Sequence, residues 1–234
     1  MENKYCPICL KEYETFPSKC TCGYDAFDKK DLLEDTQLFK IFKFAKQVYL
    51  GLISYDKSEL RINESDDYLY IEDIKNKKRG LEYIDYANKN KPTSADEGLF
   101  AMRYSTVAVI LNCDYINFFV FDDSNARILI LGKDVKGFSN GTFMQYCNLR
   151  YIYVDDKNPY FETRDNVLID KKSMTLIAYP NDKKDEEYKV DKDIKKICES
   201  AFKFQTHLKR IYIPKSIVLS TKKNKIYNVE VIRY

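Results

Sequence analysis

Four cysteines near the N-terminus have the residue type and the spacing of metal ligands. The first two form a Cys-x-x-Cys pair and the last two a Cys-x-Cys pair, with ten residues between the pairs. Two close pairs joined by a short hairpin can bring four thiolates to one tetrahedral point, which is the geometry of structural zinc. Four protein ligands leave no coordination position for water, so such an ion stabilises a fold and is not catalytic. We therefore expect one structural Zn2+ to bind Cys6, Cys9, Cys20 and Cys22.

The residues that flank these cysteines fit tight metal-binding turns. Pro7 fixes the φ angle just after the first ligand, and Gly23 permits a left-handed turn just after the last. Over residues 4–27 the segment resembles the zinc-ribbon family, although its second pair has one intervening residue where two are commoner. A ribbon this short cannot fold by burial alone, so zinc binding would supply on the order of 10 kcal/mol of folding free energy. Two disulfides, an iron–sulfur centre and a redox pair are the alternative interpretations.

The single histidine and the paired acidic residues do not complete a catalytic motif. His207 stands before a predicted strand, without a partner motif for nucleophilic or acid–base chemistry. Asp122-Asp123 and Asp155-Asp156 each follow a predicted strand, where aspartate commonly forms turns. The sequence also lacks the Gly-x-Gly-x-x-Gly, Walker, His-Glu-x-x-His and Gly-x-Ser-x-Gly motifs. We therefore expect a protein that is not an enzyme.

The three remaining cysteines, Cys113, Cys147 and Cys198, are expected to be small hydrophobic residues of the interior. A reactive thiol needs cationic neighbours that lower its pKa. Cys198 has Lys195 and Lys196 close in sequence. A reactive thiol at Cys198 is therefore the alternative interpretation.

Composition excludes several broad classes of protein. Hydrophobic residues make up 44% of the 234 residues, which is too many for a mostly disordered chain. The 39 Lys and Arg against 36 Asp and Glu give a net charge of +3, too small to indicate a nucleic-acid-binding protein by itself. The chain starts Met-Glu-Asn-Lys-Tyr-Cys, without an apolar signal-peptide core, and has no run of 18 apolar residues. We expect a cytoplasmic protein that does not enter a membrane.

Residues 29–95 read as a helical connector or N-terminal cap. Apolar residues recur at helical spacing within residues 31–53, at Leu38, Phe42, Ala45, Tyr49 and Leu52, and Phe39, Ile41, Phe44 and Val48 widen the stripe. We expect this helix to pack against the following domain, with a membrane-surface helix as the alternative. Residues 68–74 predict a strand. The basic runs KNKKRG and NKNKP within Lys75–Pro92 are the basis for a nucleic-acid interpretation, but acidic neighbours favour a solvated loop.

Residues 96–234 contain an internal repeat. Residues 134–154 (DVKGFSNGTFMQYCNLRYIYV) align without a gap with residues 193–213 (DIKKICESAFKFQTHLKRIYI), at an offset of 59. The matched pairs include Phe143 with Phe202, Leu149 with Leu208, Ile152 with Ile211, Tyr153 with Tyr212, and Val154 with Ile213. Each copy therefore carries a Leu-x-x-Ile-x-Val/Ile strand after a phenylalanine. This pattern predicts a solenoid in which the aliphatic residues point inward and neighbouring coils stack.

The length of the offset indicates more than one coil per repeat. A leucine-rich coil has about 20–29 residues, so 59 residues hold two or more coils. The intervening strands are expected at Val167–Ile169 and from Leu176 onward. An earlier, degenerate copy is expected from Leu99, with strands at Val107–Leu111, Phe118–Phe121 and Ile128–Leu131.

These residues resemble the leucine-rich-repeat proteins of the BspA-like class. The resemblance rests on residues 141–152 (GTFMQYCNLRYI), 158–169 (NPYFETRDNVLI) and 175–180 (TLIAYP). Glycine is sparser than in that family, and Thr206 stands where the first copy has Cys147. The resemblance implies a solenoid with a parallel sheet, and a surface that binds another protein.

Together these observations predict an α/β chain of three parts: a zinc ribbon (1–28), a helical connector or cap (29–95) and a leucine-rich-repeat solenoid with a parallel sheet (96–234). We expect a non-enzymatic binding or scaffold protein. Strand alternation indicates that its partner, another protein, contacts the outward side chains Tyr151, Tyr153, Arg210 and Tyr212. A nucleic-acid-associated protein that uses the ribbon and the Lys-rich connector is the alternative.

Overall fold

The computed structural model describes residues 35–74, 80–87, 90–97, 99–100, 106–121, 124–139, 142–143, 148–217 and 228–234. Cys6, Cys9, Cys20 and Cys22 lie outside these ranges, so the zinc ribbon stays a prediction. Cys147, the Asp122-Asp123 pair and most of the run KNKKRG lie outside them as well.

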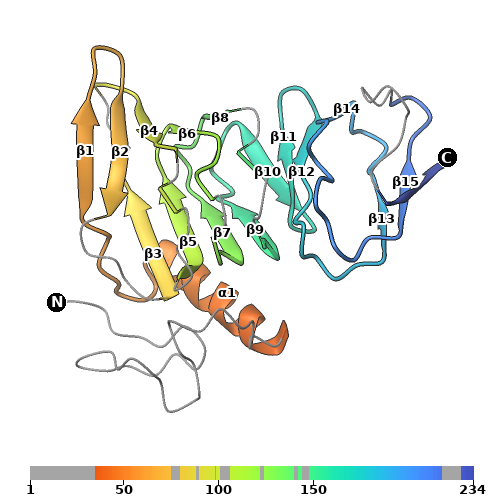
Figure 1. The fold of residues 1–234 in the computed structure, drawn as a ribbon, viewed down its shortest axis with the longest axis horizontal. Helices are drawn as coiled ribbons and strands as arrows, with labels where there is room; N and C mark the ends of the chain where they lie inside the picture. Colours follow the sequence, from red (N-terminus) through yellow and green to blue (C-terminus); the bar gives the residue numbers. More distant parts are fainter. Residues whose placement is uncertain are drawn as a thin grey trace.

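The chain forms a β-solenoid, in which successive strands alternate between two walls (Figure 1). One wall, the rear sheet, contains β1 (Leu60–Glu64), β2 (Leu69–Ile74), β4 (Thr93–Ala95), β6 (Tyr115–Ile116) and β8 (Gly137–Phe138). The other wall, the front sheet, contains β3 (Gly80–Asp85), β5 (Thr106–Asn112), β7 (Ile128–Leu131) and β9 (Tyr151–Val154). All pairs in both walls are parallel except β1 with β2. Parallel pairing follows from coiling, because each strand returns in the same direction one turn later.

A hairpin interrupts the solenoid after β9. It consists of β10 (Phe161–Arg164) and β11 (Val167–Asp170), which pair in antiparallel fashion. Coiling then resumes in two further sheets. The hairpin sheet adds β12 (Thr175–Ala178) and β14 (Lys196–Ile197), and the C-terminal sheet contains β13 (Glu187–Lys189), β15 (Arg210–Ile213) and β16 (Glu230–Arg233).

The strand register explains the 59-residue repeat. Ile128 pairs with Tyr151 and Glu187 pairs with Arg210, so the coil that ends at each of these strands advances 23 residues, whereas the coils from Ala108 to Ile128 and from Arg210 to Glu230 advance 20. The interval from Tyr151 to Arg210 holds one such coil and the longer coil that contains the hairpin. The expectation of two or more coils per repeat is thereby confirmed.

Most expected strands are present, and one is not. Strands occur at the positions expected around residues 107–111, 128–131, 167–169 and 176–178. The strand expected at Phe118–Phe121 is wrong, because these residues form a turn in which Phe119 has a φ of 56°. Val120 and Phe121 are nevertheless buried. The apolar residues at 118–121 therefore indicated buried side chains but not a β-strand.

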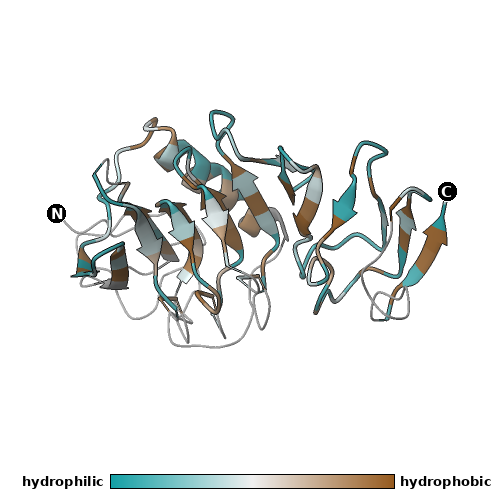
Figure 2. Cartoon of the chain, turned by 90° about the horizontal axis from the view of Figure 1, so that it is seen from above, coloured by the Kyte–Doolittle hydropathy of each residue, from teal (hydrophilic) through white to brown (hydrophobic). Residues whose placement is uncertain are grey.

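The inward side chains are those that the repeat predicts. Leu149, Ile152 and Val154 are buried in the first core, and their repeat partners Leu208, Ile211 and Ile213 are buried in the second. Near the C-terminus, hydrophobic and hydrophilic positions alternate along the strands (Figure 2). This alternation is expected of strands with one buried face.

Helix α1 (Asp35–Tyr49) covers the outer face of the front sheet. The front sheet needs such a cover because β5 is buried at every position from Thr106 to Asn112, and strands covered on both faces are apolar throughout. The helix and its packing were expected. Its buried stripe differs from the expected one, because Leu52 lies beyond the helix and is 71% exposed. The buried helix residues are Leu38, Ile41, Phe44, Ala45 and Val48.

The solenoid sheets continue across the boundary that we expected at residue 95. β4 pairs with β6 in the rear sheet, and β3 pairs with β5 in the front sheet. Strands within residues 29–95 therefore belong to the same walls as later strands, and α1 is an outer layer on one of those walls. Within the described residues, α1 is the one α-helix, and the coils themselves are built from strands and turns.

Candidate partner-binding surface

The outer face of the front sheet is occupied by α1. The Tyr151 ring stacks on Phe42, with centroids 5.0 Å apart and planes at 12°. Lys46 Nζ lies 3.9 Å from the centre of the Tyr153 ring. Both tyrosines point away from the core, as strand alternation predicts, but they contact the helix. The expectation that Tyr151 and Tyr153 face an open surface is therefore corrected, because the apolar stripe of α1 covers that surface.

A hydrogen bond holds the end of α1 to the same sheet. The Tyr49 hydroxyl donates to Asp155 Oδ2 over 2.5 Å and accepts from the backbone N–H of Lys133 over 3.1 Å. Burial and the bond to Asp155 raise the pKa of Tyr49 well above its ordinary value, so the hydroxyl stays protonated and donates. Asp155 also accepts a hydrogen bond from the backbone N–H of Lys157. The Asp155 carboxylate therefore stabilises the turn after β9 as well as the contact with α1.

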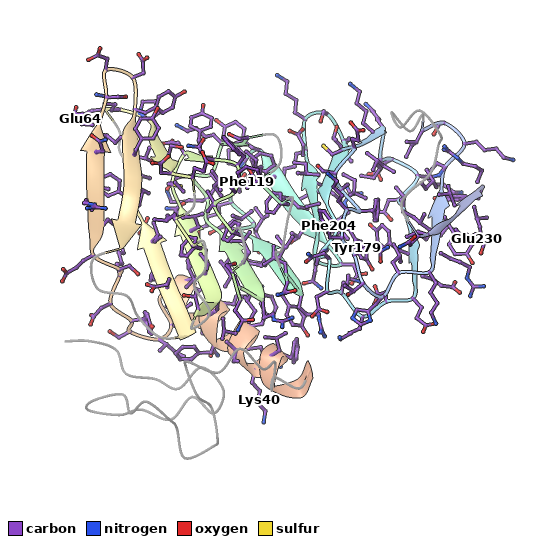
Figure 3. All side chains as sticks on the ribbon, in the orientation of Figure 1. Lys40, Glu64, Phe119, Tyr179, Phe204 and Glu230 are labelled. Atoms are coloured by element: carbon purple, nitrogen blue, oxygen red, sulfur yellow. The ribbon has the colours of Figure 1, made fainter. Side chains whose placement is uncertain are left out.

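Helix α1 does not reach the outer face of the C-terminal sheet (Figures 1 and 3). Arg210 is exposed and Tyr212 is half-buried, whereas Ile211 and Ile213 between and beyond them are fully buried. The ladder places Glu187 and Glu230 beside Arg210, and Ile232 beside Tyr212. We call this surface the open face, and its residues are Glu187, Lys189, Arg210, Tyr212, Glu230 and Ile232.

The open face carries exchangeable charges around a tyrosine. Arg210 forms an ion pair with Glu187, and the Tyr212 hydroxyl donates to Glu187 Oε2 over 3.2 Å. These groups are solvated, and exposed ion pairs contribute little to stability. Contacts with a partner can therefore replace these ion pairs with little loss of free energy. Arg and Tyr are also the residue types that most often anchor protein interfaces.

An ion cluster joins the two parts of the solenoid. Asp182 Oδ2 accepts from Arg127 Nη1 over 3.0 Å and from Arg150 Nη2 over 2.7 Å. Both arginines directly precede front-sheet strands and are only 7% exposed. Burial raises the pKa of the Asp182 carboxyl, but the hydrogen bond from Arg150 and the charges of Arg150, Arg127 and Lys184 outweigh it. The pKa of Asp182 therefore lies below its ordinary value.

His207 lies at the edge of this cluster. Its Nε2 is 3.2 Å from Asp182 Oδ1 and 2.9 Å from Lys184 Nζ. The histidine therefore does have a carboxylate neighbour, which its sequence context did not indicate. Within the described residues its side-chain contacts include no nucleophile, so the geometry is that of a structural junction.

Replacing Asp182 with asparagine is expected to cost about 3 kcal/mol of unfolding free energy at pH 7, because it removes the carboxylate facing two buried guanidinium groups. A depressed native pKa stabilises the fold above the ordinary carboxyl pKa, and this stabilisation is lost as the pH falls through the native pKa. The deficit of Asp182→Asn relative to wild type should therefore shrink below about pH 4. Urea denaturation at several pH values measures it. The exposed control Asp66→Asn should lose less than about 0.5 kcal/mol, and an equal loss in both variants would contradict the assignment.

The environments of the described cysteines do not activate a thiol. Cys113 is fully buried, and burial raises the pKa of its thiol to about 12. Burial also raises the pKa of the half-buried Cys198 thiol, with a further increase from the charge of Asp170. Reactive thiols need the opposite shift, so these surroundings disfavour the alternative of a reactive Cys198. No group of three or more His, Cys, Asp or Glu within the described ranges could hold a metal ion.

No protein-family model matches the chain, and no curated protein matches it. Among solved structures, the chain is similar to the pneumococcal vaccine antigen PcpA, with 13% identity, a TM-score of 0.36, and coverage of 70% of this chain and 65% of that one. It is similar to a leucine-rich repeat protein from Eubacterium ventriosum, with 16% identity, a TM-score of 0.40, and coverage of 72% and 64%. It is also similar to a leucine rich cell surface protein from Faecalibacterium prausnitzii, with 11% identity, a TM-score of 0.40, and coverage of 78% and 76%. The chain thus spans slightly less than two thirds of the first two structures.

In the part of the chain that the structure describes, no helix has both the length and the apolar character required to cross a bilayer.

Proposed function

We propose that the protein is a non-enzymatic binding or scaffold protein that contacts another protein through the open face. The supporting observation is the position of α1. The helix covers the outer face of the front sheet, and none of the described residues forms a corresponding layer over the C-terminal sheet.

The chemistry of the open face favours a protein ligand with both charge signs. Glu187 and Glu230 flank Arg210, and Lys189 lies on the neighbouring strand. Such a mixed surface offers complementary pairing to a folded partner, whereas nucleic acid binds surfaces with an excess of cations. Tyr212 and Ile232 supply the apolar centre that a polar rim would surround.

We further infer that the coils belong to the leucine-rich-repeat class. The advances of 20, 23 and 27 residues between paired strands lie within the range of that class, and Leu149 and Leu208 occupy equivalent buried positions before their strands. These features favour the leucine-rich-repeat interpretation over other parallel β-solenoids.

A paired-variant capture experiment tests the proposed surface. The immobilised protein is exposed to extract of its native cells, and each retained protein is quantified for wild type and for the double variant Arg210→Glu, Tyr212→Ala. Loss of two interface anchors should weaken retention of the specific partner at least about tenfold. The matched control Arg61→Glu, Tyr70→Ala changes the same residue types on β1 and β2 and should retain the partner. Equal retention by both double variants would exclude the open face.

We also infer that Cys6, Cys9, Cys20 and Cys22 hold one structural Zn2+, on the chemistry of four cysteine ligands in two close pairs. Purified protein should contain about one zinc per chain, and Cys6→Ser with Cys20→Ser should reduce the content to near zero. The control Cys113→Ala should keep the metal. Iron in place of zinc, or a metal-free protein whose thiols are oxidised, would overturn this inference.

A further inference from the structure

A cleft of about 310 Å3 lies where the hairpin interrupts the solenoid. The rear sheet ends at β8, and the next sheet starts with the hairpin, so the wall is not continuous there. One side of the cleft is β8 with the turn that follows it, and the other side is β12 together with Cys198 and Ser200, which follow β14. None of its lining residues belongs to the open face.

The apolar part of the cleft includes three phenylalanine rings, and Phe138 contacts the other two. The ring centre of Phe138 lies 5.1 Å from that of Phe143 and 4.7 Å from that of Phe161. Phe161 is buried, and Phe138 and Phe143 are half-buried. The three rings offer an apolar surface to one side of a ligand.

The polar part of the cleft is rich in hydroxyl groups. Ser139, Thr142, Ser173, Thr175 and Ser200 line it. Asp170 Oδ1 accepts from the backbone N–H of Ser173 over 2.6 Å and from its hydroxyl over 2.9 Å, which fixes the carboxylate. Neither Asp170 Oδ2 nor Ser200 Oγ is hydrogen-bonded to any described residue. These two atoms are available to a ligand that donates hydrogen bonds.

The charges around the cleft disfavour an anion. Lys136 is its one cationic lining residue within the described chain, and Lys136 Nζ forms a 2.6 Å ion pair with the buried Asp114. Asp170 adds a negative charge without a cation beside it. A phosphate or carboxylate ligand would meet this charge without compensation.

We propose that the cleft binds a neutral saccharide unit. A sugar ring has a face of C–H groups, which would lie on the phenylalanine rings, and a rim of hydroxyl groups, which would donate to Asp170 and exchange bonds with the serine and threonine side chains. A carboxylate acceptor makes stronger hydrogen bonds than a neutral one. The volume is at the lower end of ligand sites, which suits one or two sugar rings.

Saturation-transfer NMR with maltose, cellobiose and lactose tests the proposal on the full chain, with glucuronate and a small primary amine as comparison probes. At least one neutral disaccharide should bind with a Kd on the order of 1 mM, and glucuronate should bind more weakly. Asp170→Asn should weaken binding about tenfold, the loss of one charge-assisted hydrogen bond. Ser200→Phe should abolish binding by filling the cleft.

Two control variants separate the site from general effects. Ser216→Phe places the same ring at an exposed position, and Asp66→Asn removes an exposed carboxylate, so both should bind as wild type. Circular dichroism confirms that each variant is folded. Binding of the amine alone, binding that survives Ser200→Phe, or no transfer to any neutral disaccharide would each overturn the proposal.

Discussion

Ile41→Asp is expected to destabilise the folded protein by about 4 kcal/mol or more. Ile41 is 1% exposed and lies between α1 and the outer face of the front sheet. The substitution removes a large buried side chain and places a carboxylate against aliphatic residues such as Ile110 and Ile128. The buried residues that the structure describes in this cluster are all apolar and cannot compensate the charge, so the helix and the sheet lose their contact together.

The exposed neighbour Lys40 supplies the matched control for this prediction. Lys40 projects from the solvent side of α1 (Figure 3), so Lys40→Asp introduces the same carboxylate without burial and should cost less than about 1 kcal/mol. Chemical denaturation measures both variants. If Ile41→Asp unfolds at the same denaturant concentration as wild type, the packing of α1 does not contribute to the free energy of unfolding, and α1 is not a layer of the fold.

Asn158→Asp is expected to cost about 3–4 kcal/mol. The Asn158 side chain is 1% exposed and makes four hydrogen bonds that join two successive turns. Its Nδ2 donates to the carbonyls of Gly132 and Val135, both over 2.9 Å. Its Oδ1 accepts from the N–H groups of Tyr160 and Phe161, both over 2.8 Å.

The replacement keeps the shape and reverses the hydrogen bonding on one side. Aspartate can still accept the two N–H bonds, but its second oxygen faces two carbonyl oxygens. The native state would therefore raise the pKa of the introduced carboxyl above its ordinary value of about 3.9, so the deficit relative to wild type should shrink as the pH falls through that raised pKa and be smallest below about pH 4. Thermal denaturation at pH 7 and pH 3.5 measures this. Asn148→Asp, at an exposed position, should leave the stability nearly unchanged. A similarly small effect of Asn158→Asp would show that the four hydrogen bonds of the Asn158 amide do not stabilise the fold.

Repetition and alternation in the sequence predicted the parts of the fold that depend on one coil. Ile152 and Val154 alternate with Tyr151 and Tyr153, so their inward direction followed from the strand period alone. The alignment with Leu208, Ile211 and Ile213 then required stacked coils, because neither copy can bury its own apolar face. The helix over residues 35–49 was also visible as an amphipathic pattern.

Sequence repetition and alternation did not predict the contacts between residues that are far apart in the chain. Tyr153 and Tyr212 are matched positions of the repeat, but α1 covers the first and not the second. The apolar runs of β5 and β7 indicate strands that are covered on both faces, but they do not identify α1 as the cover. Asp182 likewise contacts Arg127 and Arg150 only because the coil that contains the hairpin places residue 182 beside the starts of β7 and β9. The cleft has the same origin, since it depends on where the hairpin divides the wall.

The position of partner contact tests the proposed function most directly. A photo-crosslinking amino acid is placed at Tyr212 or at Tyr151, and each protein is irradiated in native cell extract. At Tyr151 we predict a crosslink within the chain to residues 35–49, without a gain in mass. At Tyr212 we predict a covalent adduct with a second polypeptide, reduced by an excess of wild-type protein. An adduct with another polypeptide at Tyr151, together with none at Tyr212, would contradict both the covering role of α1 and the assignment of the open face.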